Sequence, residues 1–273
     1  MRPGSLDDRS GRDRPGRGIP KEEDERHLPR VVSFPRPGGG QRLITLLDRA
    51  DDEAYRAAVG PAVGPIERAL GPGVTGNRVA DPVVVRLEDW RRARRRHGML
   101  AEALRGRAER RGGLLLAADV RDCYGSISPG AVGEALVSLG THPSVVGRIR
   151  RMLERLARDG AGGLPVGPEP SGALANAVLV AADRAVLRVG GRPSLRWVDD
   201  VLAAAPDERG AGRIVEALAE ALGRFGLSLN AAKTRVFEPV PGSVAGVGGS
   251  GSGIPPGPPT PLRSAGSAGE DPR

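Results

Sequence analysis

The chain has 273 residues, with 41 basic and 33 acidic side chains, a formal net charge of +8 and a pI near 10.8. Its single cysteine excludes a disulfide framework, and it contains neither an apolar run of about 18 residues, as a membrane span requires, nor the apolar core of a secretory signal. We therefore expect a cytoplasmic protein without a membrane partner, and the basic excess favours nucleic acid as the partner.

The two ends of the chain differ in composition from its middle. Residues 1–30 mix charges with Gly and Pro and are predicted to be a disordered leader. Residues 239–273 are a Gly/Pro-rich tail, which we predict to be disordered because it cannot bury enough apolar area to fold. Between them, residues 31–111 hold mixed short elements and an arginine-dense helix from Leu87, and residues 112–238 have a clearer pattern.

Residues 112–238 show a regular series of elements. Apolar residues on both sides of Asp199-Asp200 predict a hairpin over residues 194–204 with the two acids at its tip. The order strand, helix, strand, strand, helix, strand predicts an α+β fold with a ferredoxin-like antiparallel sheet and helices on one face. The other predicted elements are a buried strand at 114–119, helices at 130–158 (broken near His142-Pro143), 170–188 and 207–225, and short edge strands at 227–229 and 234–237.

Three carboxylates are expected to meet at one edge of this sheet. Asp119 ends the first strand and the Asp199-Asp200 pair lies at the tip of the hairpin, on neighbouring central strands. Three acids within a few ångströms repel one another strongly unless a cation lies between them. Mg²⁺ takes carboxylate oxygens together with substrate phosphates, so the site predicts two Mg²⁺ ions, with Mn²⁺ as the alternative. On spacing alone, a solvated turn is the stronger interpretation of the Asp pair.

A composition this biased makes rare residues informative. Lysine occurs only at Lys21 and Lys233, and asparagine only at Asn77, Asn176 and Asn230. Positions that retain a suppressed residue type are candidates for a specific role.

Four segments resemble, in order and spacing, the palm motifs of reverse transcriptases. Each motif is weak alone, and the four together are specific. The chain therefore resembles a bacterial reverse transcriptase, nearest to the group II intron, retron and defence-associated enzymes. The resemblance implies a right-hand polymerase with a palm at residues 112–238 and a fingers-like region at 31–111, whose residues 35–59 are loosely similar to the first fingers segment. The four segments are DVRDCYGSI (119–127), GLPVGPEPSGALAN (163–176), RWVDD (196–200) and GLSLNAAKT (226–234).

The resemblance assigns chemistry to particular residues. Asp119, Asp199 and Asp200 would hold the metal ions. Tyr124 would be an aromatic gate that clashes with a ribose 2′-hydroxyl, with a buried palm aromatic as the alternative. Lys233 would give a proton to the leaving pyrophosphate, which an arginine cannot do because its pKa stays above about 12; an ordinary surface lysine is the alternative.

Further residues would contact substrate or nucleic acid. Arg42 would bind the triphosphate, and the loop of Gly163, Pro165 and Gly167 would approach the incoming nucleotide. Ser171 and Asn176 would line or brace the helix that follows. Trp90 is expected in the core, with stacking on a base as the alternative. The arginine-dense helix, which also carries Arg105, would track phosphates, and a solvated charged face is an equal alternative; its contact residues would be Arg91, Arg92, Arg95 and Arg96.

The implied function is an RNA-directed DNA polymerase that adds deoxynucleotides from triphosphates to the 3′-hydroxyl of a DNA primer on an RNA template. Two alternatives stay open: a template-independent or protein-primed polymerase of a defence type, and a catalytically dead palm that binds nucleic acid. After Phe237 the sequence has no counterpart of the family's helical thumb. Either a partner protein or a structured RNA clamps the duplex in its place, or the chain is a truncated or decayed copy, or only short extension is needed.

Overall fold

The computed structural model describes residues 30–35, 41–158, 162–190 and 194–239. The predicted leader, apart from Arg30, and the predicted tail, apart from Pro239, lie outside these ranges. The fold is α+β, with seven helices and eight strands in the described ranges. No helix there combines the length and the apolar character that crossing a bilayer requires.

The helices are α1 (Arg49–Ala69), α2 (Trp90–Arg110), α3 (Cys123–Ser126), α4 (Pro129–Ser138), α5 (Pro143–Arg158), α6 (Glu169–Arg188) and α7 (Glu208–Gly223). The strands are β1 (Arg30–Pro35), β2 (Gln41–Leu46), β3 (Val79–Asp81), β4 (Arg86–Leu87), β5 (Leu114–Asp119), β6 (Ser194–Trp197), β7 (Asp200–Ala205) and β8 (Arg235–Phe237).

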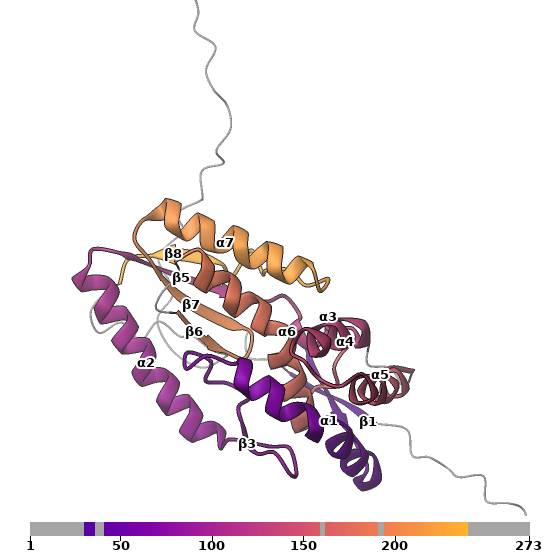
Figure 1. Ribbon diagram of the computed structural model, residues 1–273. Coiled ribbons are helices and arrows are strands. Elements are labelled where there is room, and N and C mark those ends of the chain that lie inside the picture. The colour runs from indigo at the N-terminus through magenta and orange to yellow at the C-terminus, as the bar shows by residue number, and fades with distance from the viewer. Residues whose placement is uncertain (1–29, 36–40, 159–161, 191–193, 240–273) are drawn as a thin grey trace, which may run out of the picture.

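A four-stranded antiparallel sheet of order β6-β7-β5-β8 organises the molecule (Figure 1). The buried strand β5 and the β6–β7 hairpin are where the sequence predicts them. The edge strand predicted at 227–229 is wrong, because only Leu229 makes a bridge, to Val120. The chain there bends across the end of β5, where Arg121 N donates to Ser228 O (2.9 Å) and Asn230 N donates to Asp119 O (2.7 Å).

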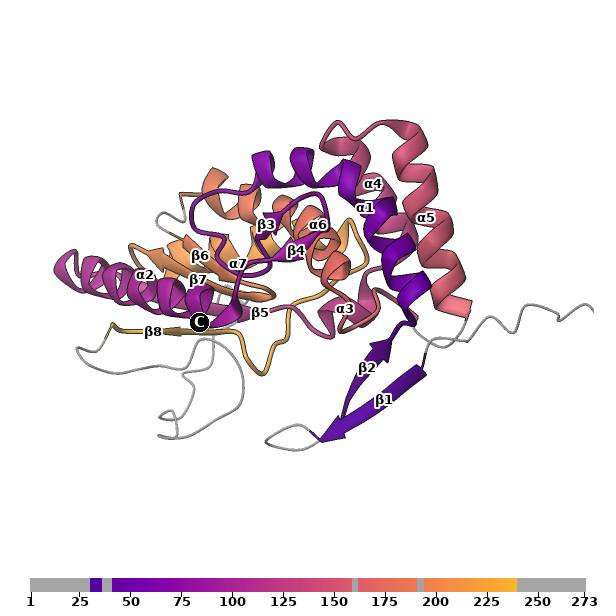
Figure 2. The ribbon, with the colours of Figure 1, turned by 90° about the horizontal axis from the view of Figure 1, so that it is seen from below.

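Helices cover both faces of the sheet, so the prediction of helices on one face is wrong. On one face, α6 and α7 pack over Leu116 and its neighbours. On the other, α2 lies along the sheet (Figure 2). The sequence predicts that the arginine-dense helix tracks phosphates or presents a solvated charged face, but its small apolar residues also recur at helical spacing and cover this second face of the sheet. The cluster there contains Ala101, Leu104, Ala108, Leu115, Leu195 and Leu202.

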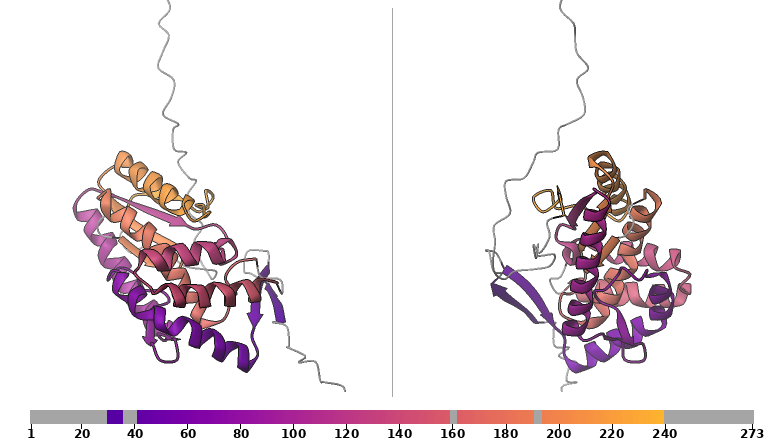
Figure 3. Two further views of the ribbon diagram at one scale, coloured as in Figure 1. Left: turned by 45° about the vertical axis from the view of Figure 1, so that its right-hand side comes forward. Right: turned by 90° about the vertical axis from the view of Figure 1, so that its left-hand side faces the viewer.

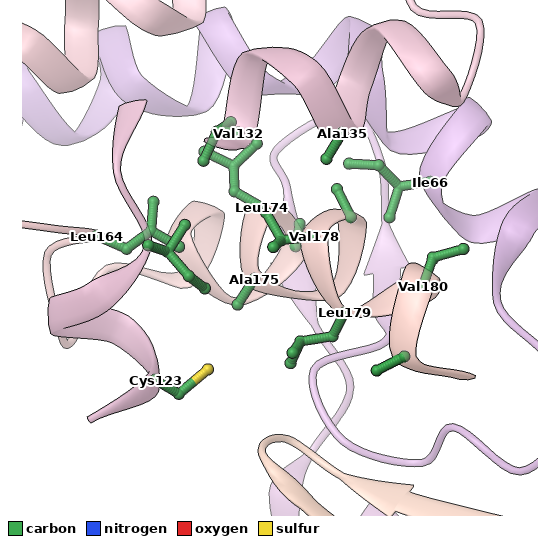
Figure 4. Packing of buried hydrophobic residues seen from close by; sticks show 14 of the residues in the cluster. Ile66, Cys123, Val132, Ala135, Leu164, Leu174, Ala175, Val178, Leu179 and Val180 are labelled. Atoms are coloured by element: carbon green, nitrogen blue, oxygen red, sulfur yellow. The ribbon is translucent and has the colours of Figure 1, made fainter. Parts of the chain in front are cut away.

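Helix α6 is the centre of the main core. Every residue from Pro170 to Val180 is buried, as expected of a helix segment enclosed by other elements, and the C-terminal part of the helix has an exposed side at Arg184 and Arg188. Figure 4 shows its side chains meeting Val132 and Ala135 of α4 and Ile66 of α1. Helix α1 also packs against α5. Elements from residues 31–111 and 112–238 therefore share one hydrophobic cluster.

The β1–β2 hairpin projects from the body (Figure 3). Its Phe34 and Leu43 are about half exposed, at 48% and 55%. The end of the hairpin near the body is tied by one backbone hydrogen bond, from Thr45 N to Val166 O (2.7 Å). This bond sets β2 against the glycine-containing loop that precedes α6.

Candidate active site

The strand register brings the predicted acids to one end of the sheet. Asp119 of β5 pairs with Asp200 of β7, and Asp200 pairs with Trp197 of β6. Residues directly opposite on neighbouring strands point to the same face, so Asp119, Asp200 and Trp197 lie side by side on one face. We call Asp119 and Asp200, together with Asp199, the carboxylate row. Asp199 lies in the two-residue turn between β6 and β7, and its carbonyl accepts from Val120 N (3.3 Å).

Lys233 supplies the positive charge that the row needs. Its Nζ lies 2.9 Å from Asp119 Oδ1 and 3.2 Å from Oδ2. Asp119 is 5% exposed, whereas the Lys233 side chain is 64% exposed. Asn230 Nδ2 also donates to Asp119 Oδ1 (3.1 Å). The hydrogen bond to Asp119 raises the pKa of Lys233, so the ammonium stays charged.

The surroundings of Asp199 and Asp200 disfavour the ionised form of both carboxyls. Burial raises the pKa of Asp199, the charge of Asp119 raises it further, and Lys233 and Arg42 oppose the rise. Burial and the charges of Asp199 and Asp119 raise the pKa of Asp200 to about 6. Crowded, partly desolvated carboxyls of this kind gain most from a cation.

The donor chemistry of the row fits Mg²⁺, which prefers carboxylate oxygens. The described residues contain no group of three or more His, Cys, Asp or Glu side chains already arranged to hold a metal ion. The cation that contacts Asp119 is the Lys233 ammonium. A divalent ion at Asp119 therefore requires the exposed lysine to turn away.

A buried arginine fixes the hairpin that carries the acids. Arg196 of β6 is 2% exposed. Its Nε and Nη2 donate to the two carboxylate oxygens of Asp183 (2.8 Å each). Its Nη1 donates to Asn176 Oδ1 (2.8 Å) and to the carbonyl of Val198 (2.7 Å). Val198 has φ +57°, a conformation disfavoured for a β-branched residue. The hydrogen bond from Arg196 to the Val198 carbonyl stabilises this conformation of the β6–β7 turn.

Asn176 extends this network to the segment before β3. Its Nδ2 donates to the carbonyls of Gly76 (3.1 Å) and Asn77 (3.0 Å). Gly76 lies so close to the hairpin that a Cβ would collide with the backbone nitrogen of Val198. Ser171 is buried and its hydroxyl bonds to Tyr55 (3.1 Å). Both side chains are thus hydrogen-bonded within the protein, as a bracing role requires.

Tyr124 lies beneath the loop predicted to meet the nucleotide. Its half-buried ring packs on the core, and its hydroxyl accepts from Asn77 Nδ2 (2.8 Å). Leu164 N donates to Tyr124 O (2.8 Å). A Cβ at Gly163 would collide with the carbonyl oxygens of Tyr124 and Gly125, so glycine is required there. Gly167 follows Pro165 and Val166 at φ +121°, where the loop meets β2.

The predicted basic residues divide into three groups. Arg42, on β2, is exposed and its charge reaches Asp199. Arg91, Arg92 and Arg95 of α2 are exposed, whereas Arg96 is bound by both oxygens of Glu88 (3.1 and 2.7 Å).

Two expectations about α2 are corrected by the structure. Arg105 of α2 is 4% exposed, and its Nη1 donates to the carboxylate of Glu102, so its side chain does not face solvent. Trp90 is 61% exposed rather than in the core, because the first turn of α2 extends past the sheet that the rest of the helix covers.

Sequence reasoning did not assign roles to several residues of the site. The sequence marks Arg196 only as part of the RWVDD motif, and no pattern marks Asp183. The rarity of asparagine was the usable signal, since all three asparagines of the chain contact the site: Asn77 at Tyr124, Asn176 at Arg196 and Asn230 at Asp119.

Arg196→Lys is expected to destabilise the fold by about 3 kcal/mol. The lysine keeps the charge but cannot make the paired bonds to Asp183 and the two further bonds, so buried acceptors are left unsatisfied. Urea unfolding measures the change. Arg184→Lys, on the exposed side of α6, is the matched control. A loss no larger than that of the control would show that the network does not hold the hairpin.

Asp200→Asn is expected to stabilise the metal-free protein at neutral pH. The folded-state pKa of Asp200, about 6, lies above its ordinary value of 3.8. The folded chain therefore binds more protons between pH 4 and 6, and stability falls as the pH rises through that window, by up to about 3 kcal/mol. Asparagine removes this penalty.

Chemical unfolding at pH 7 and pH 4 in a chelating buffer tests this expectation. The stability difference between the Asp200→Asn and unmodified proteins should be present at pH 7 and vanish at pH 4. Glu216→Gln, at an exposed position of α7, should show no such difference. An equal difference at both pH values would contradict the assigned titration.

Comparison with known proteins identifies the fold. No family model matches the sequence, and no curated protein matches it. Among solved structures, the chain is similar to an apo telomerase from Candida tropicalis truncated from its C-terminal domain, with 12% identity, a TM-score of 0.50, and 77% of this chain and 50% of that chain covered. It is also similar to telomerase from Candida albicans in complex with the TWJ fragment of telomeric RNA, with 14% identity, a TM-score of 0.51, and 77% and 41% covered.

The chain thus matches half or less of the length of these telomerases. At this identity the likeness concerns the fold alone. The chain has a polymerase palm-like fold of the reverse-transcriptase type.

Proposed function

We propose that this chain is an RNA-directed DNA polymerase that adds deoxynucleotides to a primer 3′-hydroxyl. The observation that carries the proposal is the carboxylate row: Asp119 and Asp200 are paired in register, Asp199 lies at the adjacent turn, and Lys233 lies within 2.9 Å of Asp119. These are the four positions that the palm motifs mark in the sequence. The reverse-transcriptase type of fold supports the same class of reaction.

The chain's own residues account for substrate placement. When bound at Asp119 and Asp199, with Asp200 as the third carboxylate, Mg²⁺ would favour the ionised 3′-hydroxyl and neutralise charge on the leaving pyrophosphate. Arg42, whose charge already reaches Asp199, would contact the triphosphate. The loop at Gly163–Gly167 would let backbone approach the nucleotide. Arg91, Arg92 and Arg95 on α2 would contact phosphates of the duplex, because α2 lies on the same face as the carboxylate row.

Lys233 would act as the proton donor to the pyrophosphate. Its ammonium is protonated and its side chain is mostly exposed, so it can leave Asp119 for the leaving group. In the absence of substrate it neutralises the acid that it later releases. This exchange of partners explains how one lysine can serve both the resting site and the reaction.

Finer assignments belong to the same proposal. The strand order β6-β7-β5-β8, with α6 and α7 on one face, supports a ferredoxin-like palm. Affiliation with the bacterial group II intron, retron or defence enzymes rests on the sequence motifs. A clamping partner protein or structured RNA stays a prediction.

A second candidate is a catalytically dead palm that binds nucleic acid. The contact of Lys233 with Asp119 favours it, because the ammonium takes the place of a metal at that carboxylate. The two candidates differ in one property: only the polymerase incorporates nucleotides when a divalent ion is supplied.

Primer extension by the full chain tests the proposal. A labelled DNA primer on an RNA template, with deoxynucleotides and Mg²⁺, should be elongated, and Asp199→Ala should reduce the rate by about a thousandfold or more, since metal-ion stabilisation is worth several kcal/mol. Glu216→Ala, an exposed acid of α7 outside the site, should leave the rate unchanged.

The outcomes separate the candidates. Elongation that persists without template would favour the template-independent or protein-primed alternative. Nucleic-acid binding without incorporation at any Mg²⁺ or Mn²⁺ concentration would overturn the polymerase in favour of the dead palm.

Tyr124→Ala is expected to raise the use of ribonucleotides relative to deoxynucleotides by about 10- to 100-fold, because the ring no longer meets the 2′-hydroxyl. Tyr124→Phe keeps the ring and loses only the hydrogen bond from Asn77, so it should keep the discrimination. Single-nucleotide incorporation with each triphosphate measures the ratio. An unchanged ratio in Tyr124→Ala would contradict the gate.

A further inference from the structure

A groove of about 460 Å³ lies between the first turn of α2, strand β4 and the end of β6. We call it the tryptophan groove, because it is lined by Trp90 and Trp197, the two tryptophans of the chain. Asn77, Arg86, Glu88 and Glu169 line it as well. Apart from the alternative of base stacking at Trp90, none of the roles described above uses this groove.

The two tryptophans differ in how they are held. The ring of Trp197 is fixed from behind: the His97 ring lies 5.5 Å away and the Arg94 guanidinium lies 5.9 Å from its centroid. Burial and Arg94 lower the pKa of His97 to about 4, so the imidazole beside Trp197 is neutral. Trp90 is 61% exposed. A large apolar ring left in solvent beside a hollow does little for the core and is available to a ligand.

Two of the three acids of the groove, Glu88 and Glu169, are bound by internal cations, whereas the carboxylate of the third, the exposed Asp89, accepts among the described residues only from Arg92 N (2.9 Å) at the start of α2. Both Glu88 oxygens are bound by Arg96 (3.1 and 2.7 Å). Glu169 accepts from Arg56 Nη1 (2.8 Å) and from Leu87 N (3.2 Å). By contrast, the exposed guanidinium of Arg86 has no hydrogen bond or ion pair within the described ranges. The groove thus offers aromatic surface and the positive charge of Arg86, with the Asp89 carboxylate at the N-terminus of α2 as its remaining acid.

The position of the groove points to its occupant. Trp197 is the register partner of Asp200, about 4.8 Å away across the sheet, and Asn77 donates to Tyr124. The groove therefore adjoins the proposed nucleotide site on two sides. Successive nucleotides of a strand rise by about 3.4 Å, so an unpaired base one or two positions beyond the row would reach it.

We propose that the tryptophan groove binds an unpaired base of the template strand, stacked on Trp90, with Arg86 on its phosphate. Base–aromatic stacking suits such a site because it tolerates every sequence. The inference rests on the proposed function for the identity of the strand. The contact itself does not require catalysis.

Tryptophan fluorescence tests the proposal directly, because the chain has only these two reporters. The probes are an RNA–DNA hybrid with a four-nucleotide single-stranded 5′ RNA extension and the same hybrid with blunt ends. The extended hybrid should quench Trp90, observed alone in Trp197→Phe, and the blunt hybrid should not. Trp90→Ala should weaken binding of the extended hybrid, measured by anisotropy, by about tenfold, since stacking one base is worth about 1–3 kcal/mol.

Matched variants make the result specific. Met99→Ala removes another exposed apolar side chain of α2 (68% exposed) outside the groove and should not change binding. Trp90→Phe should keep most of the affinity. All measurements are repeated in Asp199→Ala: quenching that persists there supports the groove even if no polymerase activity is found.

Equal affinity of Trp90→Ala and the unmodified chain for the extended hybrid would overturn the proposal. So would an equal loss on blunt and extended hybrids, which would make Trp90 a general duplex contact. Absence of quenching, with Trp90→Ala impairing only association with another protein, would replace it by a protein-docking surface.

Discussion

The geometry of the candidate site depends on one buried cation. The Arg196 guanidinium makes four hydrogen bonds to three residues, and they join α6, the β6–β7 turn and, through Asn176, the segment before β3. Removing a guanidinium from water is costly unless it is neutralised and its donors are satisfied. Asp183 supplies the opposite charge, and the planar arrangement of donors fits a carboxylate better than an ammonium would.

The second constraint is the balance of charge at the end of the sheet. Three carboxyls lie at the same end of the sheet, where their charges raise the pKa values of Asp199 and Asp200. The positive charges of Lys233, in the segment before β8, and of Arg42, on β2 of the projecting hairpin, offset the negative charge of these acids. The positive groups come from parts of the chain that lie toward solvent, whereas the acids are set on the sheet. The more exposed partner of the Asp119 ion pair is therefore the cation, Lys233.

Sequence patterns predicted the palm elements well because their signals are local. The apolar run of β5, the hairpin and the break before Pro143 all appear at the expected positions. Helix α1 was not predicted: Pro61 and Pro65 lie inside it, and proline ordinarily ends a helix. Tertiary contacts with α5 and α6 outweigh that preference.

The site was predicted less completely, because bonds between distant residues leave little trace in one sequence. The acids and Lys233 could be found from their motifs. Asp183 could not be found in this way, since its partner Arg196 is 13 residues away along the chain and no motif includes Asp183. The exposure of Trp90 also depends on where the sheet ends beneath α2, which no local pattern encodes.

The common hydrophobic cluster has a practical consequence for dissecting the molecule. Tyr55 and Ile66 of α1 are fully buried against helices that follow residue 112, and α2 seals one face of the sheet. A fragment beginning at residue 112 would expose both surfaces and lose the segment that braces the hairpin. The two halves expressed separately should thus be insoluble. If the refolded halves are mixed, they can complement each other only by forming the common hydrophobic cluster.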